Sequence, residues 1–541
     1  MLRRDFAKTA VMVGGALVLG RRLGSQSAAD SRIEIALDEP IATIAPEIYG
    51  HFTENLGGVI YDGVWVGENS PVPNVGGIRR ALVEKLRAIH APVIRWPGGC
   101  FADSYDWRDG VGPRDKRPRR TNFWVGSAEQ HHLGNGPQAF DPNQFGTDEF
   151  VHFCRLAGAE PYFAANLRSL PALQFDRWVE YCNSPAGSTT AADLRAASGS
   201  PQPYDVRYWG VGNESWGCGG NFTPEEYAAE YRRFTSWVPD YGVGLKLIAS
   251  GPSSDDVDWT TRFFENILGT RPITAPFGWS VHNYTFGKDA LKFDANEAYA
   301  TFKKAFSTEK IIVDNWAALG VYDRRRRVKL VVDEYGDWYN GGNNLGSEVS
   351  PADIFGQQIT MRDAIVTAFT LDIFNRHADK VALGACAQLI NCINALFLAH
   401  GDQFTVTPNF HVFDFYAAHQ GGQAVRAEFS APTLNFMDTG AKPAPASFWG
   451  LNGSASRRGT TLTLTVVNPH LTQARDTEIA LRGARPTAVT ARVLTGPDIH
   501  AHNTFAAPNA VTPRAATAVV SSGAVRFTFP PASVTQLTVA L

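Results

Sequence analysis

Residues 206–226 read VRYWGVGNESWGCGGNFTPEE, a short apolar run followed by a glycine-rich turn and a helix start. Val206–Val211 has the length and character of a buried strand. Thr223-Pro224-Glu225-Glu226 combines an N-cap threonine, a proline at the first helical position and a capping-box glutamate. A strand that leads into a helix is the repeating unit of parallel α/β folds.

The same unit recurs from about residue 45 to residue 420. Helix-like stretches such as Ile78–Ile89 and Ile359–Phe374 separate short apolar runs. Eight alternations predict an α/β fold of the (β/α)8 TIM-barrel type. The eight runs are Glu47–Phe52, Val93–Trp96, Tyr162–Ala165, Val206–Val211, Leu245–Ser250, Trp279–His282, Val328–Val332 and Val381–Ala385.

After about residue 421 the pattern changes to period-two alternation, as in Thr461–Val466, Val525–Phe529 and Val534–Val539. Glycine and proline clusters separate these runs, which predicts a C-terminal antiparallel β-sandwich of the jelly-roll-like kind. Arg32–Leu37 also alternates. We therefore expect a strand at 30–44 that joins the sandwich, a catalytic barrel at 45–420 and the sandwich at 421–541.

The N-terminus resembles a bacterial export signal. Arg3-Arg4 begins a twin-arginine pattern, the apolar run Ala10–Gly20 is too short to span a bilayer, and small residues at Ser25–Ala29 offer a cleavage site. Residues 1–29 are therefore predicted to be a twin-arginine signal peptide, and the mature protein to be periplasmic or secreted. Arg21-Arg22 keeps an uncleaved anchor open as the alternative.

Composition excludes several classes of function. A net charge of −3 over 541 residues gives no reason to expect a nucleic acid or an anionic membrane as partner. Six cysteines in a chain of 541 residues do not make a disulfide scaffold. They include no CxxC pair, so a structural zinc site is not expected. The 13 tryptophans slightly favour a carbohydrate-binding cleft, because such clefts use flat apolar rings. No GxSxG, P-loop or dinucleotide motif stands between a strand and a helix.

Two glutamates follow strands at the predicted barrel mouth. Glu214 comes after the fourth run and Glu334 after the seventh, and reactive groups of such barrels lie at the C-terminal ends of strands. Hydrolysis of an acetal needs one carboxyl group to protonate the leaving oxygen and a second to attack or stabilise the sugar. A single glutamate after a strand is usually structural. Two at these positions, the first preceded by Asn213, resemble the large clan of retaining glycosidases.

Six motifs narrow this resemblance to a family. Together, and in this order along nearly the whole mature chain, they resemble glycoside hydrolase family 51, the α-L-arabinofuranosidases. The motifs are Tyr49–Gly57, Ile94–Asp103, Trp209–Glu214, Val281–Tyr284, Asp333–Tyr339 and Ala387–Asn391.

The resemblance implies a role for each site residue. Glu214 is implied as the acid/base, Glu334 as the nucleophile and Asn213 as the partner of the sugar 2-hydroxyl, a contact that strengthens towards the transition state. Arg95 is placed to keep Glu334 ionised. Glu54 is implied to receive furanose hydroxyls, with an ordinary surface carboxylate as its alternative.

Three further roles concern the two catalytic carboxylates and the sugar. Tyr284 is expected to hydrogen-bond the nucleophile, and Gln388 to hold the nucleophile or the sugar ring. His282 is expected to orient the acid/base, with a satisfied core histidine as the alternative.

The chain departs from the commonest family pattern at Cys100, where many relatives carry asparagine after the Pro-Gly-Gly turn. A sugar contact is then lost or made differently. Cys218 is expected near the same part of the mouth, and a disulfide between the two cysteines is a hypothesis that the sequence leaves open.

The expected activity is that of a retaining exo-α-L-arabinofuranosidase acting on arabinoxylan, arabinan or their oligosaccharides, with no metal and no cofactor. The alternatives are the same two-glutamate site acting on a galactofuranoside or cutting a β-1,4-glucan internally, and a carbohydrate-binding protein without catalysis. Expected partners are an arabinose-containing glycan and no nucleic acid, with no membrane after signal cleavage. The sequence does not decide which glycan is the natural substrate or whether the enzyme acts in exo or endo mode. It also leaves open whether the chain forms a homo-oligomer.

Overall fold

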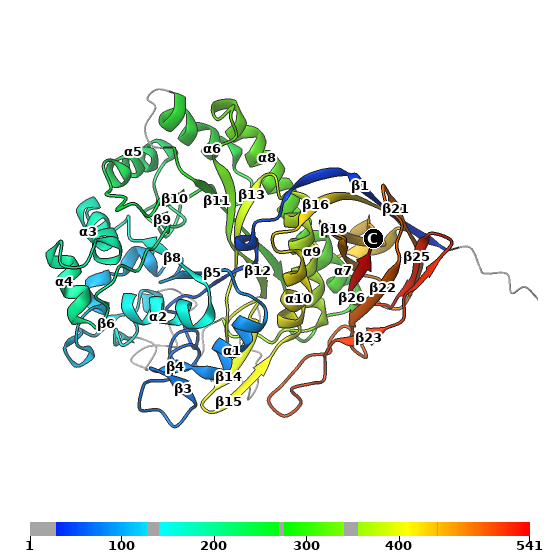
Figure 1. Cartoon of the computed structure of the whole chain (residues 1–541), viewed down its shortest axis with the longest axis horizontal. Helices are drawn as coiled ribbons and strands as arrows, with labels where there is room; N and C mark the ends of the chain where they lie inside the picture. Colours follow the sequence, from blue (N-terminus) through cyan, green and yellow to red (C-terminus); the bar gives the residue numbers. More distant parts are fainter. Residues whose placement is uncertain (1–28, 127–139, 270–274, 340–354, 441) are drawn as a thin grey trace, which may run out of the picture.

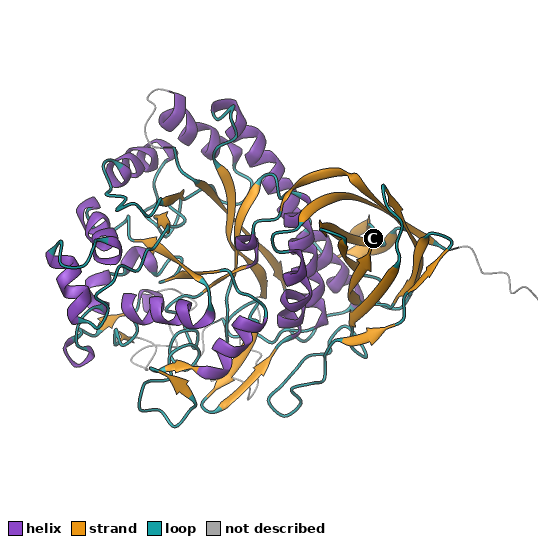
Figure 2. Cartoon of the chain, in the orientation of Figure 1, coloured by secondary structure: helices purple, strands orange, loops and turns teal. Residues whose placement is uncertain are grey.

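The computed structural model describes residues 29–126, 140–269, 275–339, 355–440 and 442–541 (Figure 1). All but the last residue of the predicted signal peptide, 1–29, lies outside these ranges. The chain forms two neighbouring bodies, one of alternating helices and strands and one made mainly of strands (Figure 2).

The first body is a closed barrel of eight strands, and all eight neighbouring pairs are parallel. Each of the eight apolar runs overlaps one barrel strand, so the TIM-barrel prediction is confirmed. The strands are β2 (Gly50–Phe52), β5 (Val93–Trp96), β8 (Glu160–Ala165), β9 (Tyr208–Val211), β10 (Lys246–Ala249), β11 (Gly278–Gly287), β12 (Lys329–Tyr339) and β13 (Val381–Cys386).

Helices cover the barrel. The predicted capping box begins α5, since the Glu226 backbone N–H donates to Thr223 Oγ1 at 3.3 Å and the Thr223 N–H donates to Glu226 Oε2 at 2.8 Å. The α-helices are α1 (Arg80–Ala88), α2 (Thr147–Ala157), α3 (Ala172–Asn183), α4 (Thr190–Ala197), α5 (Pro224–Thr235), α6 (Val257–Phe264), α7 (Ala295–Ala305), α8 (Ser307–Tyr322), α9 (Met361–Arg376) and α10 (Pro408–Tyr416).

The second body is a mixed ten-stranded sheet in the order β23-β22-β26-β20-β19-β16-β1-β21-β25-β24. β1 pairs antiparallel with β16 but parallel with β21, a departure from the all-antiparallel expectation. Its strands are β1 (Ser31–Thr43), β16 (Gln423–Ser430), β19 (Asn452–Arg458), β20 (Thr461–Asn468), β21 (Arg475–Arg482), β22 (Ala488–Leu494), β23 (Arg514–Ala516), β24 (Val519–Ser521), β25 (Ala524–Phe529) and β26 (Ser533–Ala540).

This sheet encloses its own core. Val493 of β22 and Phe527 of β25 lie towards opposite ends of the strand order, yet both belong to one hydrophobic cluster with Ile33 of β1. Alternate residues of each strand therefore point inwards, which explains the period-two pattern. The predicted domain limits at residues 30–44, 45–420 and 421–541 stay predictions.

Short two-stranded ribbons complete the described structure. They are β3 (Asn74–Val75) with β4 (Ile78–Arg79), β6 (Arg120–Thr121) with β7 (Phe140–Asp141), β14 (Phe397–His400) with β15 (Gln403–Val406), and β17 (Leu434–Asp438) with β18 (Ala444–Phe448).

Helix α9 lies between the barrel and the sheet and is buried on all sides for most of its length. Asp372 on this helix accepts hydrogen bonds from Ser454 Oγ at 2.6 Å and Thr465 Oγ1 at 2.8 Å, while Asn375 Nδ2 donates to Ser454 Oγ at 2.9 Å. We call these four residues the α9 seam. They join the helix to strands β19 and β20.

A β-bulge in β12 shapes the barrel mouth. Ser280 of β11 is opposite Val331, but His282 is opposite Glu334, so β12 carries one extra residue between these pairs. A bulge re-aims the side chains next to it. Both Asp333 and Glu334 consequently face groups of the barrel interior.

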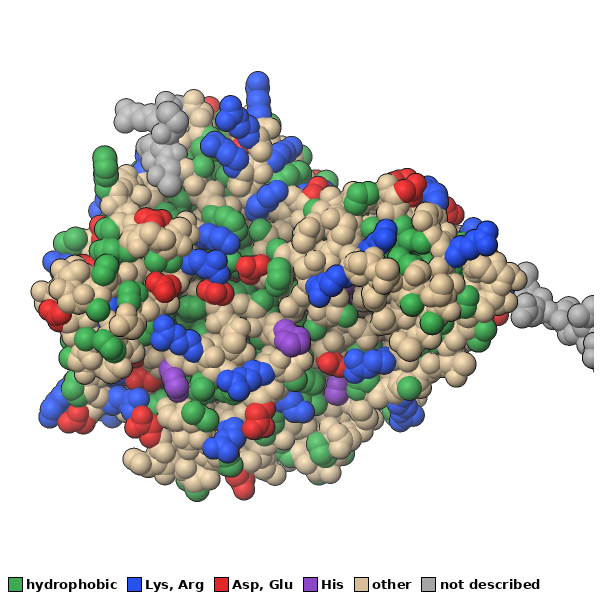
Figure 3. All heavy atoms as spheres, viewed as in Figure 1, with side chains coloured by type: hydrophobic (Ala, Val, Ile, Leu, Met, Phe, Trp, Pro, Cys, Tyr) green, Lys and Arg blue, Asp and Glu red, His purple; other side chains and the backbone are tan. Residues whose placement is uncertain are grey.

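The surface bears mixed charge. Basic and acidic side chains are interspersed over the face shown in Figure 3. Within the described ranges, no helix is both long and apolar enough to cross a bilayer.

Candidate active site

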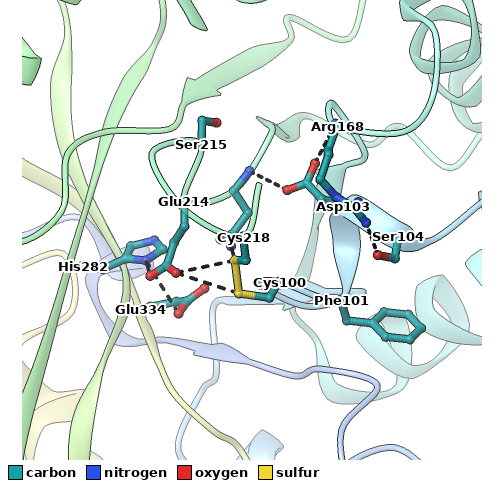
Figure 4. Close-up of a disulfide and its surroundings, with 12 residues drawn as sticks. Cys100, Phe101, Asp103, Ser104, Arg168, Glu214, Ser215, Cys218, His282 and Glu334 are labelled. Atoms are coloured by element: carbon teal, nitrogen blue, oxygen red, sulfur yellow. Dashed lines mark hydrogen bonds and ion pairs between the residues drawn. A yellow bond between two sulfur atoms is a disulfide. The ribbon is translucent and has the colours of Figure 1, made fainter. Parts of the chain in front are cut away.

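The residues singled out from the sequence come from six strands and gather at their C-terminal ends, where (β/α)8 barrels carry their reactive groups. Figure 4 shows Glu214, His282 and Glu334 facing one another. Glu54 follows β2, Arg95 lies in β5, Asn213 and Glu214 follow β9, His282 and Tyr284 lie in β11, Glu334 lies in β12, and Gln388 follows β13.

The carboxyl groups of Glu214 and Glu334 lie close together. One oxygen of each, together with one ring nitrogen of His282, form a group whose atoms are all within 4.8 Å of one another. His282 Nδ1 is 2.9 Å from Glu214 Oε1 and 3.6 Å from Glu334 Oε2. This arrangement leaves room for one reacting centre between two carboxyl groups.

The backbone of Glu214 is strained. Its φ of 39° lies in the left-handed region, which costs a residue with a side chain on the order of 1–3 kcal/mol. The N–H groups of Gly217 and Gly219 donate to Glu214 O at 2.7 and 3.2 Å and hold this turn. Strain of this kind persists only where the surroundings fix it, which is common at functional sites.

Glu334 is held at both oxygens. Arg95 Nη1 donates to Oε1 at 2.8 Å, and the Tyr284 hydroxyl donates to Oε2 at 2.9 Å. Burial raises the pKa of Tyr284 well above its ordinary value, so its hydroxyl stays a donor. A Cβ at Gly99 would lie 2.5 Å from Glu334 Oε1, so glycine is required for this close approach.

Arg95 also sets the orientation of Asn213. Its Nη2 donates to Asn213 Oδ1 at 2.6 Å. Because the amide oxygen faces the guanidinium, the Nδ2 group is the part of the amide that remains to donate elsewhere. Arg95 and Asn213 are both buried, and Asn213 Nδ2 lies 4.0 Å from Cys218 Sγ.

Asp333 is a site residue that the sequence analysis missed. It accepts hydrogen bonds from Tyr162 Oη at 2.6 Å and Ser280 Oγ at 2.5 Å, and its carboxylate lies 3.6 Å from Arg95 Nε. Burial opposes its charge, but Arg95 and His282 outweigh burial and hold the pKa of Asp333 below its ordinary value. Regular alternation predicts only one inward residue of the Asp333-Glu334 pair, and the bulge in β12 turns both inward.

His282 lies between carboxylates. Its Nδ1 faces Glu214, and its Nε2 is 3.3 Å from Asp333 Oδ1. Burial alone disfavours the charged ring, but Glu334, Asp333 and Glu214 outweigh it and raise the pKa of His282 to about 10. A raised pKa favours the imidazolium form of the ring, which donates from both nitrogens. We call Arg95, Glu214, His282, Asp333 and Glu334 the mouth cluster.

Glu54 is a buried acid beside this cluster. Its Oε1 accepts from the backbone N–H groups of Gly99 and Phe101 at 3.2 and 3.1 Å, and its Oε2 accepts from Gln388 Nε2 at 3.1 Å. Burial and the charge of Glu334 raise the pKa of Glu54 to about 8. The raised pKa favours the protonated form of Glu54 near neutral pH, and its burial distinguishes it from the ordinary surface carboxylate of the alternative interpretation.

The structure contains the Cys100–Cys218 disulfide, with the Cα atoms 5.5 Å apart. Its sulfurs lie 3.9 Å (Cys100) and 3.7 Å (Cys218) from Glu214 Oε2. Disulfide sulfurs carry no hydrogen, so these are contacts and not hydrogen bonds. The bond thus forms one wall of the space around Glu214 (Figure 4).

A cavity of about 320 Å³ opens over these groups. Seven predicted residues line it, and an aromatic rim that the sequence analysis did not single out completes the wall. Trp216 stood in the stretch 206–226 and Trp338 in the motif Asp333–Tyr339, and these two residues were the available signal. The predicted residues are Glu54, Cys100, Glu214, His282, Tyr284, Glu334 and Gln388, and the aromatic ones are Trp124, Trp216, Phe286, Trp338 and Phe355.

Two groups of described residues have the spacing of metal ligands. They are Cys100, Glu214 and Cys218, and Glu214, His282 and Glu334. The first lacks thiolates because its cysteines form a disulfide. The second consists of the two predicted catalytic carboxyl groups and the histidine between them.

Comparison with known proteins identifies relatives along most of the chain. Residues 85–267 match the family model described as the α-L-arabinofuranosidase 1 domain, and residues 333–533 match the α-L-arabinofuranosidase C-terminal domain. An intracellular exo-α-L-arabinofuranosidase of Bacteroides ovatus is 32% identical over 517 residues, which is 93% of this chain and 95% of the relative.

Two solved structures show the same architecture. The family 51 arabinofuranosidase of Xanthomonas axonopodis pv. citri has a TM-score of 0.86 and 34% identity over 95% of this chain and 100% of its own. An α-L-arabinofuranosidase of Thermotoga maritima, solved as an arabinose complex, has a TM-score of 0.79 and 30% identity over 94% of this chain and 100% of its own.

One sequence-based expectation is wrong on this comparison. The twin-arginine pattern predicted a periplasmic or secreted protein, whereas the Bacteroides ovatus relative that matches 93% of the chain is named an intracellular enzyme. An export signal is an address read by a receptor and takes no part in packing. A short basic and apolar N-terminus can match such a pattern by composition alone, so the match to an intracellular relative outweighs it.

Proposed function

The chain belongs to the glycoside hydrolase family 51 α-L-arabinofuranosidases, and on this premise we propose that it removes terminal arabinofuranosyl residues with retention of configuration. The observation that carries the proposal is the approach of the Glu214 and Glu334 carboxyl groups, which share His282 within 4.8 Å. Retaining glycosidases hold their two carboxyl groups about 5–5.5 Å apart, whereas inverting ones need about 6.5–9.5 Å for an intervening water.

In the first step Glu334 attacks the anomeric carbon while Glu214 protonates the departing oxygen. Arg95 and Tyr284 hold the Glu334 carboxylate by one hydrogen bond at each oxygen, which keeps the carboxylate aimed at the sugar. In the second step Glu214 removes a proton from water, and the water displaces Glu334 from the sugar. The glutamates thus complete the cycle by double displacement.

The surrounding residues position the sugar. Asn213 Nδ2, turned away from Arg95, is the proposed donor to the 2-hydroxyl. Glu54, held by Gln388, is the proposed partner of further furanose hydroxyls. His282 orients Glu214 through the contact between Nδ1 and Oε1.

Exo action is supported by the size of the cavity. About 320 Å³ is at the small end of the range for ligand pockets, which suits one terminal sugar better than a run of several. The proposed substrates are arabinoxylan, arabinan and their oligosaccharides. A homo-oligomer stays a prediction.

The test is an assay of the full chain on a panel of aryl glycosides, with the product followed by NMR as it forms. We expect rapid hydrolysis of the α-L-arabinofuranoside and an initial product with the α configuration. Preference for a galactofuranoside or for internal cuts in β-1,4-glucan would reassign the substrate. An initial β product would refute retention.

A further inference from the structure

We propose that the Cys100–Cys218 disulfide positions Glu214 for proton transfer, and that a dithiol reductant entering the pocket opens this bond and slows protonation of the leaving group. This inference rests on the proposed function, because it assigns a further role within the same site.

The bond joins the ends of two barrel strands that are not paired with each other, since β8 lies between them. Cys100 follows β5, Cys218 follows β9, and the two cysteines are 118 residues apart in sequence. Glu214 lies between the end of β9 and Cys218. The disulfide therefore fixes the turn that carries Glu214 against the neighbouring loop.

The segment Cys100–Asp103 is bonded to this turn on both sides of Glu214. Before Glu214, the Asn213 backbone N–H donates to Asp103 Oδ2 at 3.2 Å. After Glu214, the connection is the disulfide between Cys100 and Cys218 (Figure 4). Because Glu214 has a φ of 39°, its turn is under strain and depends on such restraints.

The two oxygens of Glu214 have different surroundings. Oε1 is 2.9 Å from His282 Nδ1, whereas Oε2 lies against the two sulfurs at 3.9 and 3.7 Å. A disulfide offers no hydrogen, so Oε2 is left to exchange its proton with a ligand. Reduction replaces this wall by two thiols, which separate from one another and are weak S–H donors that compete for Oε2.

The bond can be reached from the pocket. Cys100 lines the cavity, and both cysteines are partly exposed. A thiolate of the reductant attacks one sulfur, the Cys100–Cys218 bond breaks, and a mixed disulfide forms. The second thiol of the reductant then displaces the chain. Two electrons and two protons pass to the cysteines, and the reductant leaves as its own disulfide.

The first experiment counts thiols on the folded full chain with a thiol-labelling reagent, before and after treatment with dithiothreitol. The other four cysteines, Cys154, Cys182, Cys386 and Cys392, are buried, so labelling of the native state reports Cys100 and Cys218. We expect no label before treatment and two labels after it, with slower reduction under saturating arabinose. Failure of native reduction, or no protection by arabinose, would overturn the proposed access through the pocket.

The second experiment compares kcat/KM for an aryl arabinofuranoside and for an arabinofuranosyl oligosaccharide. Reduction should lower kcat/KM about tenfold or more for the oligosaccharide, towards the roughly 10²–10⁴-fold contribution of a general acid. The aryl substrate, whose leaving group needs no proton, should lose far less, and oxidised glutathione should restore the activity. Equal losses would mean that the bond only supports the fold. No loss with two free thiols would also refute the proposal.

The control is the double variant Cys100→Ala/Cys218→Ala, which should resemble the reduced enzyme and be indifferent to dithiothreitol. If this variant does not fold, reversible reduction of the unmodified chain still decides the question. An oxidised chain that hydrolyses no arabinofuranoside would refute the proposed function, and this inference with it. Hydrolysis that ignores the state of the disulfide would refute this inference alone.

Discussion

Two buried aspartates of this chain have opposite electrostatic surroundings. Asp333 in the mouth cluster faces Arg95 and His282, which hold its pKa below the ordinary value. Asp372 in the α9 seam accepts from the hydroxyls of Ser454 and Thr465, and burial raises its pKa to about 6. Both side chains are almost inaccessible to solvent, so burial alone does not explain the difference.

The difference shows what each region requires. In the mouth cluster Asp333 lies within ion-pair distance of Arg95 and His282, and Glu334 lies within ion-pair distance of Arg95, so charged groups of the protein take the place of water around a buried carboxylate. The α9 seam only joins the barrel to the sheet. Its hydroxyl groups can donate to a charged carboxylate and can also accept from a neutral carboxyl group. Substitutions in the mouth cluster should therefore change activity, and substitutions in the seam should change stability.

The largest expected effect is that of Glu334→Ala. No glycosyl-enzyme can form, so activity should fall for aryl and sugar leaving groups alike, by more than the roughly 10²–10⁴-fold that a general acid–base contributes. Steady-state kinetics measure the loss of activity, and thermal unfolding measures any loss of stability. The fold should remain, because Arg95 keeps Asp333 as a partner. Substantial turnover on an aryl arabinofuranoside would contradict the assignment.

A matched pair of glycine substitutions should separate the two regions next. In Gly99→Ala the new Cβ would lie 2.5 Å from Glu334 Oε1, and a displacement near 1 Å of a reacting group can cost about 10²-fold in rate. In Gly453→Ala, beside the seam, the Cβ would lie 2.1 Å from the backbone oxygen of Thr465. This overpacking should cost about 1–3 kcal/mol in the free energy of unfolding.

Activity assays and denaturant unfolding of both glycine variants give the measurement. We expect Gly99→Ala to lose kcat/KM with little change in stability, and Gly453→Ala to show the reverse. Loss of both properties in both variants would mean that the mouth and the seam are not separable.

The smallest effect is a difference in pH dependence between Asp372→Asn and Asp333→Asn. The pKa of Asp372 is raised to about 6, so its contribution to stability is present below its ordinary pKa and is lost as the pH rises through 6. Between the ordinary aspartate pKa and pH 6, the free energy of unfolding of the unmodified chain should therefore fall by on the order of 2–3 kcal/mol relative to that of Asp372→Asn.

Asp333 should behave with the opposite sign. Its pKa is lowered in the folded chain, so its contribution is present above the ordinary aspartate pKa and is lost as the pH falls below it. Unfolding free energies of the chain and both variants across the acidic and neutral range provide the test. If the contributions of Asp333 and Asp372 to the unfolding free energy change with pH in the same direction, burial and not the charged neighbours determines the pKa of both groups.

Much of this fold could be predicted from patterns. Each barrel strand is a short apolar run and α5 begins with a capping box, because local sequence decides such features. The parallel pairing of β1 with β21 could not be predicted, since period-two alternation is the same for both directions of pairing.

For the site, sequence position located Glu214 and Glu334, because each follows an apolar run at the C-terminal end of which the reactive groups of such barrels lie. Asp333 was missed because a bulge, which alternation does not encode, turns it inward. The raised pKa values of Glu54 and His282 depend on burial and on neighbours from other strands, which only the folded chain brings together.

The most direct test of the account is the kinetic behaviour of Glu214→Ala. If Glu214 supplies the proton, kcat/KM should fall by roughly 10²–10⁴-fold for an arabinofuranosyl oligosaccharide and far less for an aryl arabinofuranoside with a leaving group of low pKa. Azide should then raise kcat on the aryl substrate by attacking the glycosyl-enzyme, giving an azide product of retained configuration. Equal losses on both substrates, without rescue by azide, would contradict the role of Glu214 and with it the proposed mechanism.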